Sequence, residues 1–267
     1  MSPATPETPG RVHVILPAFN EEESLPNLLK RFATLNQEHP ELNLVIRVID
    51  DGSSDRTAEV AALPVAGLEV IVEQHPKNMG LGQAMLTGVQ KTVAAAKGND
   101  MIVAMDADDT HDVNLIPRMA GQLADGASIS IASRFVEGGC DDTAPPFRRL
   151  LSRGASVVFR TVFPLEGIKD FTSGYRMYRA DLLKEAVRHW GERLIEEDGF
   201  ACMVELLLKL RHWEPEMREV PMLLRYDRKL SASKLKLFRT LRQYLVLAVR
   251  NSVTPAPRNN MAHVLAS

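Results

Sequence analysis

At 267 residues and 29.6 kDa, the chain is long enough to bury a full core, and its 45% hydrophobic and 25% charged residues are typical of globular proteins. This composition excludes disorder, collagen and coiled coil for most of the chain. The net charge of −2 argues against nucleic acid as a partner. That value averages two unlike halves: residues 1–147 carry 10 basic and 21 acidic side chains, whereas residues 148–267 carry 22 and 13. The basic second half is suited to an anionic membrane surface.

The cysteines and the apolar runs indicate where the protein works. Cys140 and Cys202 lie far apart, match no zinc or redox spacing, and are too few for a disulfide framework. No window reaches the roughly 18 to 20 apolar residues that span a bilayer, and the N-terminus lacks the pattern of a signal peptide. We therefore predict a cytoplasmic protein that does not cross a membrane on its own.

Short apolar runs, each followed by a polar or glycine-bearing turn and usually by a helical pattern, predict five strands in the first half. Continuous Val/Ile-rich runs of this kind are typical of a parallel sheet with helices on both faces, so the predicted fold class is α/β. The strands are expected at 12–16, 44–49, 68–72, 101–105 and 129–132.

After residue 140 this alternation is lost. We interpret the chain as one domain over 11–253, with a first half at 11–140 and a second at 141–253, between disordered tails at 1–10 and 254–267. Helices in the second half are expected at about 148–163, 181–189, 199–212 and 234–251, and strand-like pieces at 175–178 and 217–224.

Polar clusters follow the predicted strands, where ligands bind in parallel α/β sheets. Asp106-Ala107-Asp108 places two carboxylates on the same side of a strand end, and they repel each other unless a cation lies between them. One interpretation is Mg²⁺ or Mn²⁺, held by these carboxylates and by phosphate oxygens. The other is a solvated turn that caps the next helix.

Two further clusters point to a nucleotide. Asp50 and Asp51 follow a buried strand, where a carboxylate can accept hydrogen bonds from a base or a ribose hydroxyl, although they also suit a turn before a helix. Gly80 and Gly82 precede a predicted helix, and glycines there let the backbone approach a phosphate. Their spacing is not G-x-G-x-x-G, which argues against a Rossmann dehydrogenase.

Arg134 and six arginines of the second half stand beside Ser, Gly and Tyr rather than opposite acids at helical spacing. Arginine suits bidentate phosphate binding, although each arginine alone also fits an ion-paired surface residue. In the segment 234–245, an apolar stripe with basic residues beside it fits either a membrane-interface helix or a helix packed on the core. The stripe consists of Leu237, Phe238, Leu241 and Leu245. The arginines are Arg134, Arg148, Arg149, Arg153, Arg176, Arg225 and Arg228.

Taken in order, these motifs resemble those of the family 2 inverting glycosyltransferases of GT-A fold. Later segments, at 148–155, 170–176 and 233–234, are similar to those of dolichyl-phosphate (polyprenyl-phosphate) mannosyltransferases. The resemblance extends from about Arg11 to Leu247. The matching early segments are Pro17-Ala18-Phe19-Asn20-Glu21, Asp50-Asp51-Gly52-Ser53, Gly80-Leu81-Gly82, Asp106-Ala107-Asp108 and Ser133-Arg134.

The resemblance implies a role for each matched residue. Thr110 stands where the family places a further metal-side ligand such as Gln or Ser, and Phe19 where Tyr is usual. The implied metal ligands are Asp106, Asp108 and Thr110. The implied nucleotide-sugar-binding residues are Pro17, Phe19, Glu21, Ile49, Asp51, Gly80, Asp106, Ala107 and Asp108. The implied catalytic residues are Asp108, Arg134, Arg148, Ser152, Arg228 and Lys234, of which Arg134, Arg148, Ser152 and Arg228 are expected to recognise the acceptor phosphate.

The implied reaction is an in-line displacement at the anomeric carbon of a nucleotide sugar, with GDP-mannose favoured, by an oxygen of a polyprenyl phosphate. A phosphate monoester has a second pKa of about 6, so the acceptor is largely anionic at neutral pH and needs no general base. We therefore predict that the arginines position this anionic nucleophile and offset its repulsion from the donor diphosphate.

Two alternatives remain open at this point. A related enzyme that moves glucose or another sugar from a UDP donor to undecaprenyl phosphate would share these motifs. A non-catalytic nucleotide-sugar-binding subunit would need neither the metal ligands nor the acceptor arginines. The resemblance also implies peripheral association with the cytoplasmic face of a membrane, and it is compatible with a separate membrane subunit as a partner.

Overall fold

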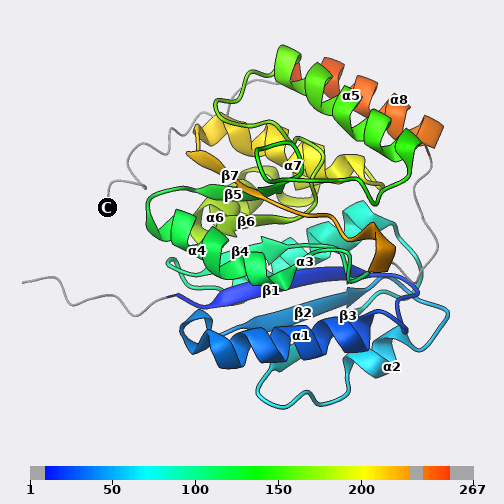
Figure 1. Cartoon of the computed structure of the whole chain (residues 1–267), viewed down its shortest axis with the longest axis vertical. Coiled ribbons are helices and arrows are strands. Elements are labelled where there is room, and N and C mark those ends of the chain that lie inside the picture. The colour runs from blue at the N-terminus through cyan, green and yellow to red at the C-terminus, as the bar shows by residue number, and fades with distance from the viewer. Residues whose placement is uncertain (1–9, 229–236, 253–267) are drawn as a thin grey trace, which may run out of the picture.

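The computed structural model describes residues 10–228 and 237–252, and Figure 1 shows their arrangement. The predicted tails, apart from Gly10, lie outside the described residues, as do Lys234 and the start of the helix predicted at 234–251. Each other strand and helix whose bounds were predicted is present, and its ends differ from the prediction by about three residues or fewer.

One sheet of seven strands runs through both halves of the chain, in the order β3-β2-β1-β4-β6-β5-β7. β6 is antiparallel to its neighbours β4 and β5, whereas the other neighbouring strands are parallel. The predicted α/β class with a mainly parallel sheet is therefore confirmed. The strands are β1 (Val12–Ala18), β2 (Val45–Asp50), β3 (Glu69–Gln74), β4 (Met101–Ala104), β5 (Ile129–Ser133), β6 (Arg176–Arg179) and β7 (Met217–Pro221).

Helices cover both faces of this sheet (Figure 1). α1, α2 and α4 pack on one face through a core cluster that includes Phe32 and Met119, and α3, α6 and α7 pack on the other. Because both faces are covered, the strands carry continuous apolar runs, as predicted. The helices are α1 (Leu25–Glu38), α2 (Thr57–Ala61), α3 (Leu81–Ala95), α4 (Ile116–Ala124), α5 (Pro146–Val162), α6 (Ala180–Trp190), α7 (Ala201–Leu210) and α8 (Leu237–Ser252).

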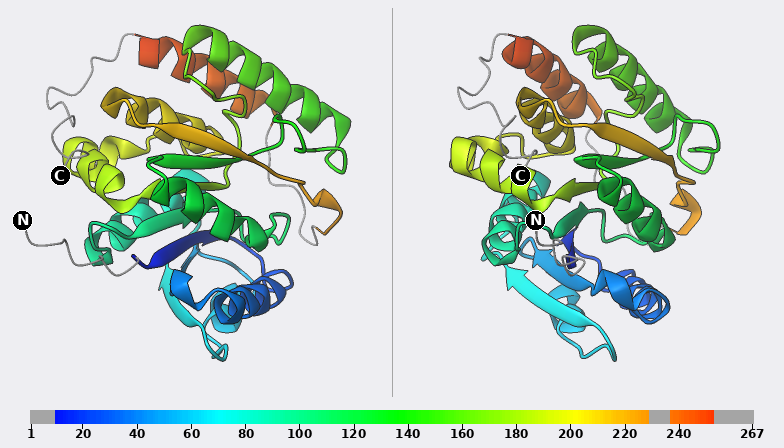
Figure 2. Two further views of the ribbon diagram at one scale, coloured as in Figure 1. Left: turned by 60° about the vertical axis from the view of Figure 1, so that its left-hand side comes forward. Right: turned by 90° about the vertical axis from the view of Figure 1, so that its left-hand side faces the viewer.

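α5 and α8 form an outer pair at one end of the molecule (Figure 2). Phe159 of α5 meets Tyr244 of α8 edge to face, with ring centroids 5.5 Å apart, and Leu247 is fully buried. Leu241 and Leu245, which belong to the predicted apolar stripe, are instead 41% and 65% exposed. The helix therefore packs on the core through a different face and leaves these two leucines at the surface.

The fold brings the predicted polar clusters to one edge of the sheet. β1, β2 and β4 are parallel neighbours, so the chain leaves all three at the same edge, and β5 points the same way because β6 is antiparallel to both β4 and β5. The segments that follow these strands carry Phe19, Asp51, Asp106 and Arg134.

The structure also bears on the cysteines and on membrane spanning. Cys140 and Cys202 are free, and burial raises the pKa of the Cys202 thiol, which makes this residue unreactive. Within residues 10–228 and 237–252, no helix is both long enough and apolar enough to cross a bilayer.

Candidate active site

Two cavities open at this edge of the sheet and share part of their lining. The β1–β2 cavity lies against the ends of β1 and β2 and the start of α3, and the α5 cavity lies against the end of β5 and the first turns of α5. Asp106, Asp108, Arg148 and Phe200 line both, so the two cavities meet at these four residues.

The β1–β2 cavity gathers most of the residues predicted to bind a nucleotide sugar. Ile49 is the exception, because it is fully buried in the core between the sheet and α3 and is not part of either lining. The residues that do line the cavity are Pro17, Phe19, Glu21, Asp51, Gly80, Asp106, Ala107 and Asp108.

Asp51 is held in the wall of the β1–β2 cavity by three hydrogen bonds. Its Oδ1 accepts from His75 Nδ1 at 2.8 Å and from the N–H of Met79 at 2.9 Å, and its Oδ2 accepts from the N–H of Gly80 at 2.8 Å. A carboxylate only accepts, so His75 Nδ1 must carry a proton; the other ring nitrogen lies 3.0 Å from Thr87 Oγ1. About one of the four acceptor positions of Asp51 remains for a ligand.

Gly80 and Gly82, at the start of α3, lie against the backbone of residues 197–198. A Cβ on Gly80, whose φ is +93°, would lie 2.6 Å from the carbonyl oxygen of Asp198, and one on Gly82 would lie 1.8 Å from that of Glu197. The N–H of Gly82 donates to the Asp198 carbonyl at 3.3 Å, and that of Gly80 is bonded to Asp51. The N–H groups of Gly80 and Gly82, which were expected near a phosphate, are thus hydrogen-bonded within the protein. Gly80 remains part of the lining of the β1–β2 cavity.

Asp106 and Asp108 follow β4 at the boundary of the two cavities. Asp108 is 7% exposed, and its Oδ1 accepts hydrogen bonds from the hydroxyl and the N–H of Thr110 at 2.7 and 3.2 Å. The next acid, Asp109, is paired instead with Arg31 at 2.5 Å. Hard oxygen donors of this kind fit Mg²⁺ or Mn²⁺. Within the described residues no group of three or more His, Cys, Asp or Glu is arranged to hold a metal ion. Mg²⁺ is commonly bound by one or two carboxylates together with water and substrate phosphates.

Arg148 of α5 lies where the cavities meet and has no acidic partner in the described part of the chain. Its guanidinium lies over the rings of Phe200 and Tyr226, at 5.8 and 5.3 Å from their centroids, and its buried Nε makes no hydrogen bond there. The next residue, Arg149, is instead paired with Asp142 at 2.7 Å. An arginine held by aromatic rings and without a carboxylate keeps its charge available to an anion.

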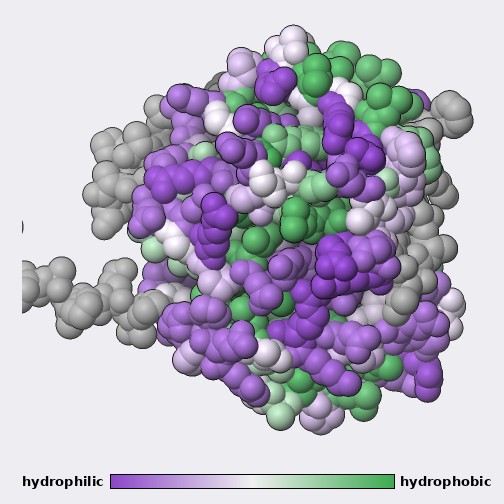
Figure 3. All heavy atoms as spheres, viewed as in Figure 1, coloured by the Kyte–Doolittle hydropathy of each residue, from purple (hydrophilic) through white to green (hydrophobic). Residues whose placement is uncertain are grey.

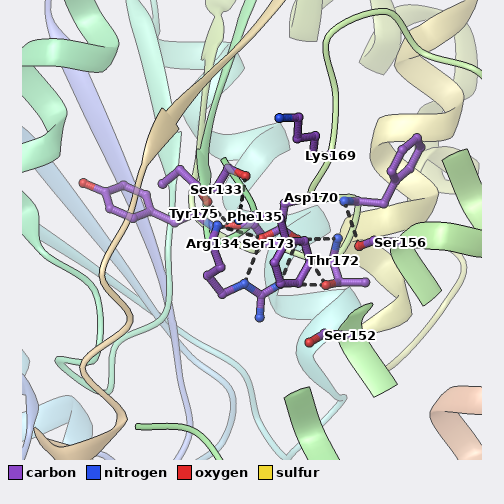
Figure 4. A network of polar contacts seen from close by, with 12 residues as sticks. Ser133, Arg134, Phe135, Ser152, Ser156, Lys169, Asp170, Thr172, Ser173 and Tyr175 are labelled. Atoms are coloured by element: carbon purple, nitrogen blue, oxygen red, sulfur yellow. Dashed lines mark hydrogen bonds and ion pairs between the residues drawn. The ribbon is translucent and has the colours of Figure 1, made fainter. Parts of the chain in front are cut away.

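Arg134 lines the α5 cavity as part of an ion pair (Figure 4). Its Nε and Nη2 lie 2.8 and 2.7 Å from the two oxygens of Asp170, and Nη2 also donates to Thr172 Oγ1 at 2.7 Å. Burial by itself raises the pKa of Asp170, but the charge and the hydrogen bonds of Arg134 outweigh this and hold that pKa below its usual range. Arg134 therefore offers N–H donors to a ligand rather than an unbalanced charge.

The other residues predicted to recognise phosphate differ in position. Ser152 lines the α5 cavity, and its hydroxyl donates to the Arg148 carbonyl at 3.0 Å. Arg228 lies in a short turn next to the cavity but is not part of either lining. Lys234 is outside the described residues. Arg176 is fully buried and donates to two backbone carbonyls, so its role is structural.

Several lining residues were not predicted. Phe200, Tyr226 and Tyr244 come from three separate segments of the second half, and burial raises the pKa of Tyr244 so that its phenol stays neutral. No local pattern marks these residues, because their common position arises only from folding. His75, which holds Asp51 but is not part of either lining, did have a signal, since it is a lone histidine between a strand and the glycine-bearing loop.

A mainly parallel sheet, with two acidic residues and two joined cavities at its carboxyl edge, is the architecture of a GT-A glycosyltransferase. The family profile described as Glycosyl transferase family 2 matches residues 13–187, which is more than half of the chain. The chain belongs to this family and is a glycosyltransferase.

Three curated relatives are similar over most of this chain. It is 34% identical over 212 residues to the dolichol-phosphate mannosyltransferase of Pyrococcus furiosus, 31% over 235 residues to the polyprenol monophosphomannose synthase of Mycolicibacterium smegmatis, and 33% over 226 residues to the undecaprenyl-phosphate mannosyltransferase of Micrococcus luteus. These alignments cover 79%, 87% and 84% of this chain. They cover 55% of the first relative, which is thus much longer, and 84% and 87% of the other two.

Solved structures support the same fold. The glucosyl-3-phosphoglycerate synthase of Mycobacterium tuberculosis, solved with Mn²⁺, UDP-glucose and phosphoglyceric acid, superposes with a TM-score of 0.63 at 19% identity, over 92% of this chain and 81% of the other. The mannosyl-3-phosphoglycerate synthase of Rubrobacter xylanophilus gives 0.56 at 21% identity, over 91% and 73%.

Proposed function

We propose that the protein transfers a hexose, mannose from GDP-mannose, to the phosphate of a polyprenyl (dolichyl-type) phosphate. The names of the three relatives refer to mannose and to dolichol phosphate, polyprenol or undecaprenyl phosphate. The observation that carries this proposal is the position of Arg148, a cation that lies between the two cavities and has no acidic partner in the described chain.

In this proposal the nucleotide sugar occupies the β1–β2 cavity. Asp51 has one acceptor position left for the base or the ribose, and His75 holds its carboxylate in place. The shared boundary of the cavities then receives the sugar and its diphosphate. A hydrogen-bonded and largely buried carboxylate is well oriented for such a site, because it loses little conformational freedom on binding.

Asp106 and Asp108 would hold the proposed Mg²⁺ or Mn²⁺ ion, together with oxygens of the donor. When bound, such a cation neutralises the charge that develops on a leaving diphosphate. Thr110 orients Asp108 through its hydroxyl and its N–H, and this fixes one carboxylate oxygen without adding a negative charge.

The acceptor phosphate would enter the α5 cavity and bind Arg148. Because a phosphate monoester is largely ionised at neutral pH, no side chain has to remove a proton from the nucleophile. Arg148 positions the anion and offsets its repulsion from the donor diphosphate. The neutral pair Arg134–Asp170 contributes hydrogen-bond donors to the same cavity.

We further propose that the outer face of α5 and α8 meets the cytoplasmic face of a membrane. Figure 3 shows hydrophobic residues gathered at the end of the molecule where α5 lies. Leu150 is 76% exposed and Leu245 65% exposed, and they stand on the two helices that also contribute Ser152 and Tyr244 to the α5 cavity. A lipid phosphate could therefore enter the cavity while its chain stays beside this apolar face.

A transfer assay tests the function. The purified protein, with Mg²⁺ or Mn²⁺ and a short polyprenyl phosphate in detergent, is given GDP-mannose, GDP-glucose, UDP-glucose or UDP-galactose, and labelled sugar in the lipid phase is measured. We expect product from GDP-mannose. Product from a UDP sugar instead would overturn the proposed donor, and no product from any donor would overturn transfer and favour a non-catalytic subunit.

A further inference from the structure

A third cavity, which we call the basic cavity, lies on the other side of Arg134 from the site described above. It is bounded by the segment that follows β5, by the middle of α5 and by Lys169. Arg134 is the one residue that it shares with the α5 cavity, and it shares none with the β1–β2 cavity. The basic cavity is therefore separate from the transfer site but in contact with it through one guanidinium.

Four cationic side chains line the basic cavity, and two of them have no counter-ion. Arg134 is paired with Asp170, and Arg153 with Asp141 at 2.7 Å. No ion pair joins Arg160 or Lys169 to an acid within the residues that the structure describes, and both side chains are exposed. In Figure 4, the Lys169 amine points away from the hydrogen bonds around Asp170. The cavity thus carries an excess of positive charge that no ion pair among the described residues neutralises.

The two ion-paired arginines of the basic cavity, Arg134 and Arg153, are also held in position. The Phe135 ring lies under two guanidinium groups, with its centroid 5.0 Å from Arg134 and 5.9 Å from Arg153. Cation–π contacts of this kind fix the direction of a guanidinium without neutralising it. Two arginines fixed beside one cavity, together with the exposed cations Arg160 and Lys169, are suited to the oxygens of a phosphate.

The surroundings of the basic cavity indicate what carries the phosphate. Val157 lines the cavity and is 53% exposed, and its neighbours on α5, Val158 and Val162, are 46% and 43% exposed. A small soluble phosphate has no apolar part that could contact these valines. A phosphate that is attached to hydrocarbon chains matches both the cations and the valines.

We propose that the basic cavity binds the phosphate of an anionic phospholipid headgroup, while the exposed valines of α5 contact its acyl region. This inference rests on the membrane association proposed above, but it does not depend on the sugar donor. It gives the membrane-facing end of the molecule a defined headgroup site besides its apolar surface. In this arrangement the acceptor phosphate lies near Arg134 in the α5 cavity, and the phospholipid headgroup lies near it in the basic cavity.

Vesicle binding tests this proposal. Binding of the full chain to phosphatidylcholine vesicles, with and without phosphatidylglycerol, is measured for the wild type, for the double variant R160Q/K169Q and for the control K30Q/R118Q. Lys30 and Arg118 are exposed and lie on α1 and α4, so the control removes the same charge elsewhere. We expect R160Q/K169Q to bind anionic vesicles about tenfold or more weakly than the wild type, and the control to change by less than about threefold.

Other results of the vesicle experiment would contradict the headgroup site. Equal losses in the two double variants would show a diffuse charge effect and overturn the headgroup site, as would a wild type that does not prefer anionic vesicles. Binding of inorganic phosphate without vesicles that is lost in R160Q/K169Q, combined with unchanged vesicle binding by that variant, would assign the cavity to a soluble anion instead. Transfer in detergent, without vesicles, should be unchanged in R160Q/K169Q, so a failure of the transfer proposal is detected separately.

Discussion

His75 Nδ1 donates a 2.8 Å hydrogen bond to Asp51 Oδ1, and this bond orients a carboxylate that lines the β1–β2 cavity. Replacing His75 with Leu removes the donor and leaves Asp51 with its two backbone partners. Because a hydrogen bond to a charged group contributes about 1.5–3 kcal/mol, we expect the KM for the nucleotide sugar to rise about tenfold or more. The KM for the lipid acceptor should change by less than about twofold.

T87V serves as a milder comparison for this prediction, because it removes the hydroxyl that contacts the other ring nitrogen of His75. We expect it to raise the donor KM less than His75→Leu does. An equal rise in donor and acceptor KM in His75→Leu would argue against a positioning role and for a general loss of structure.

Asp108 is predicted to be essential for metal-dependent transfer. D108N keeps the size of the side chain and removes its charge, so we expect kcat/KM to fall by at least about a hundredfold. Chelation of divalent cations should abolish the activity of the wild type, and added Mg²⁺ or Mn²⁺ should restore it. D109N is the matched control, since Asp109 is paired with Arg31 away from the cavities. Transfer by the wild type that persists under chelation would refute the metal requirement.

The pair Arg134–Asp170 should make stability depend on pH. R134A leaves a fully buried carboxylate without its partner, and breaking a buried pair in this way costs about 3–5 kcal/mol of unfolding free energy near neutral pH. Arg134 holds the pKa of Asp170 low, so the folded variant takes up a proton at a higher pH than the folded wild type. The stability difference is therefore largest near neutral pH and shrinks as the pH falls.

Urea unfolding of the wild type and of R134A at about pH 7 and about pH 4 measures this effect. The variant R179A is a useful comparison, because Arg179 is paired with Asp181 at a half-exposed position. We expect its loss of stability to be within about 1 kcal/mol. A loss in R134A that is independent of pH would mean that Asp170 does not titrate as described.

The apolar face of α5 and α8 is predicted to bind lipid independently of charge. L150S/L245S removes two large exposed side chains, and we expect binding to neutral vesicles to weaken by about tenfold or more, because each leucine buries apolar surface in the bilayer. L63S is the control, since Leu63 is 61% exposed on a different part of the molecule. Unchanged vesicle binding in L150S/L245S would show that another surface meets the membrane.

The strands could be predicted from the sequence because each one is a local signal. Ligands bind at the carboxyl ends of parallel strands, so the gathering of Asp51 and Asp106 at one edge was also predictable. The order of the strands, with the antiparallel β6 between β4 and β5, was not predicted. The pairing of Arg134 with Asp170 was not, since the partners are 36 residues apart and each fits several other contacts. The sequence therefore indicated the kind of residue at the α5 cavity but not which arginine would remain without an acid.

Two local patterns were misleading for physical reasons. Gly82 resembles a phosphate-binding glycine, but the backbone that approaches it belongs to Glu197 and Asp198, far along the chain. In α8, the helical spacing of the apolar residues identifies an apolar stripe, but it does not show whether protein or lipid covers that stripe. Only the burial of Tyr244 and Leu247 shows that the helix packs on the core through another face.

The role of Arg148 in binding the acceptor phosphate is tested most directly by comparing the rates of transfer to a polyprenyl phosphate and to the corresponding polyprenol. The comparison is made in the wild type, in R148Q and in R149Q. Arg149 is the matched control, because it is adjacent to Arg148 but paired with Asp142. We expect kcat/KM for the polyprenyl phosphate to fall by about tenfold or more in R148Q and much less in R149Q, and the polyprenol not to be a substrate. Comparable rates with polyprenol and polyprenyl phosphate, or an R148Q variant as active as the wild type, would contradict this role of Arg148.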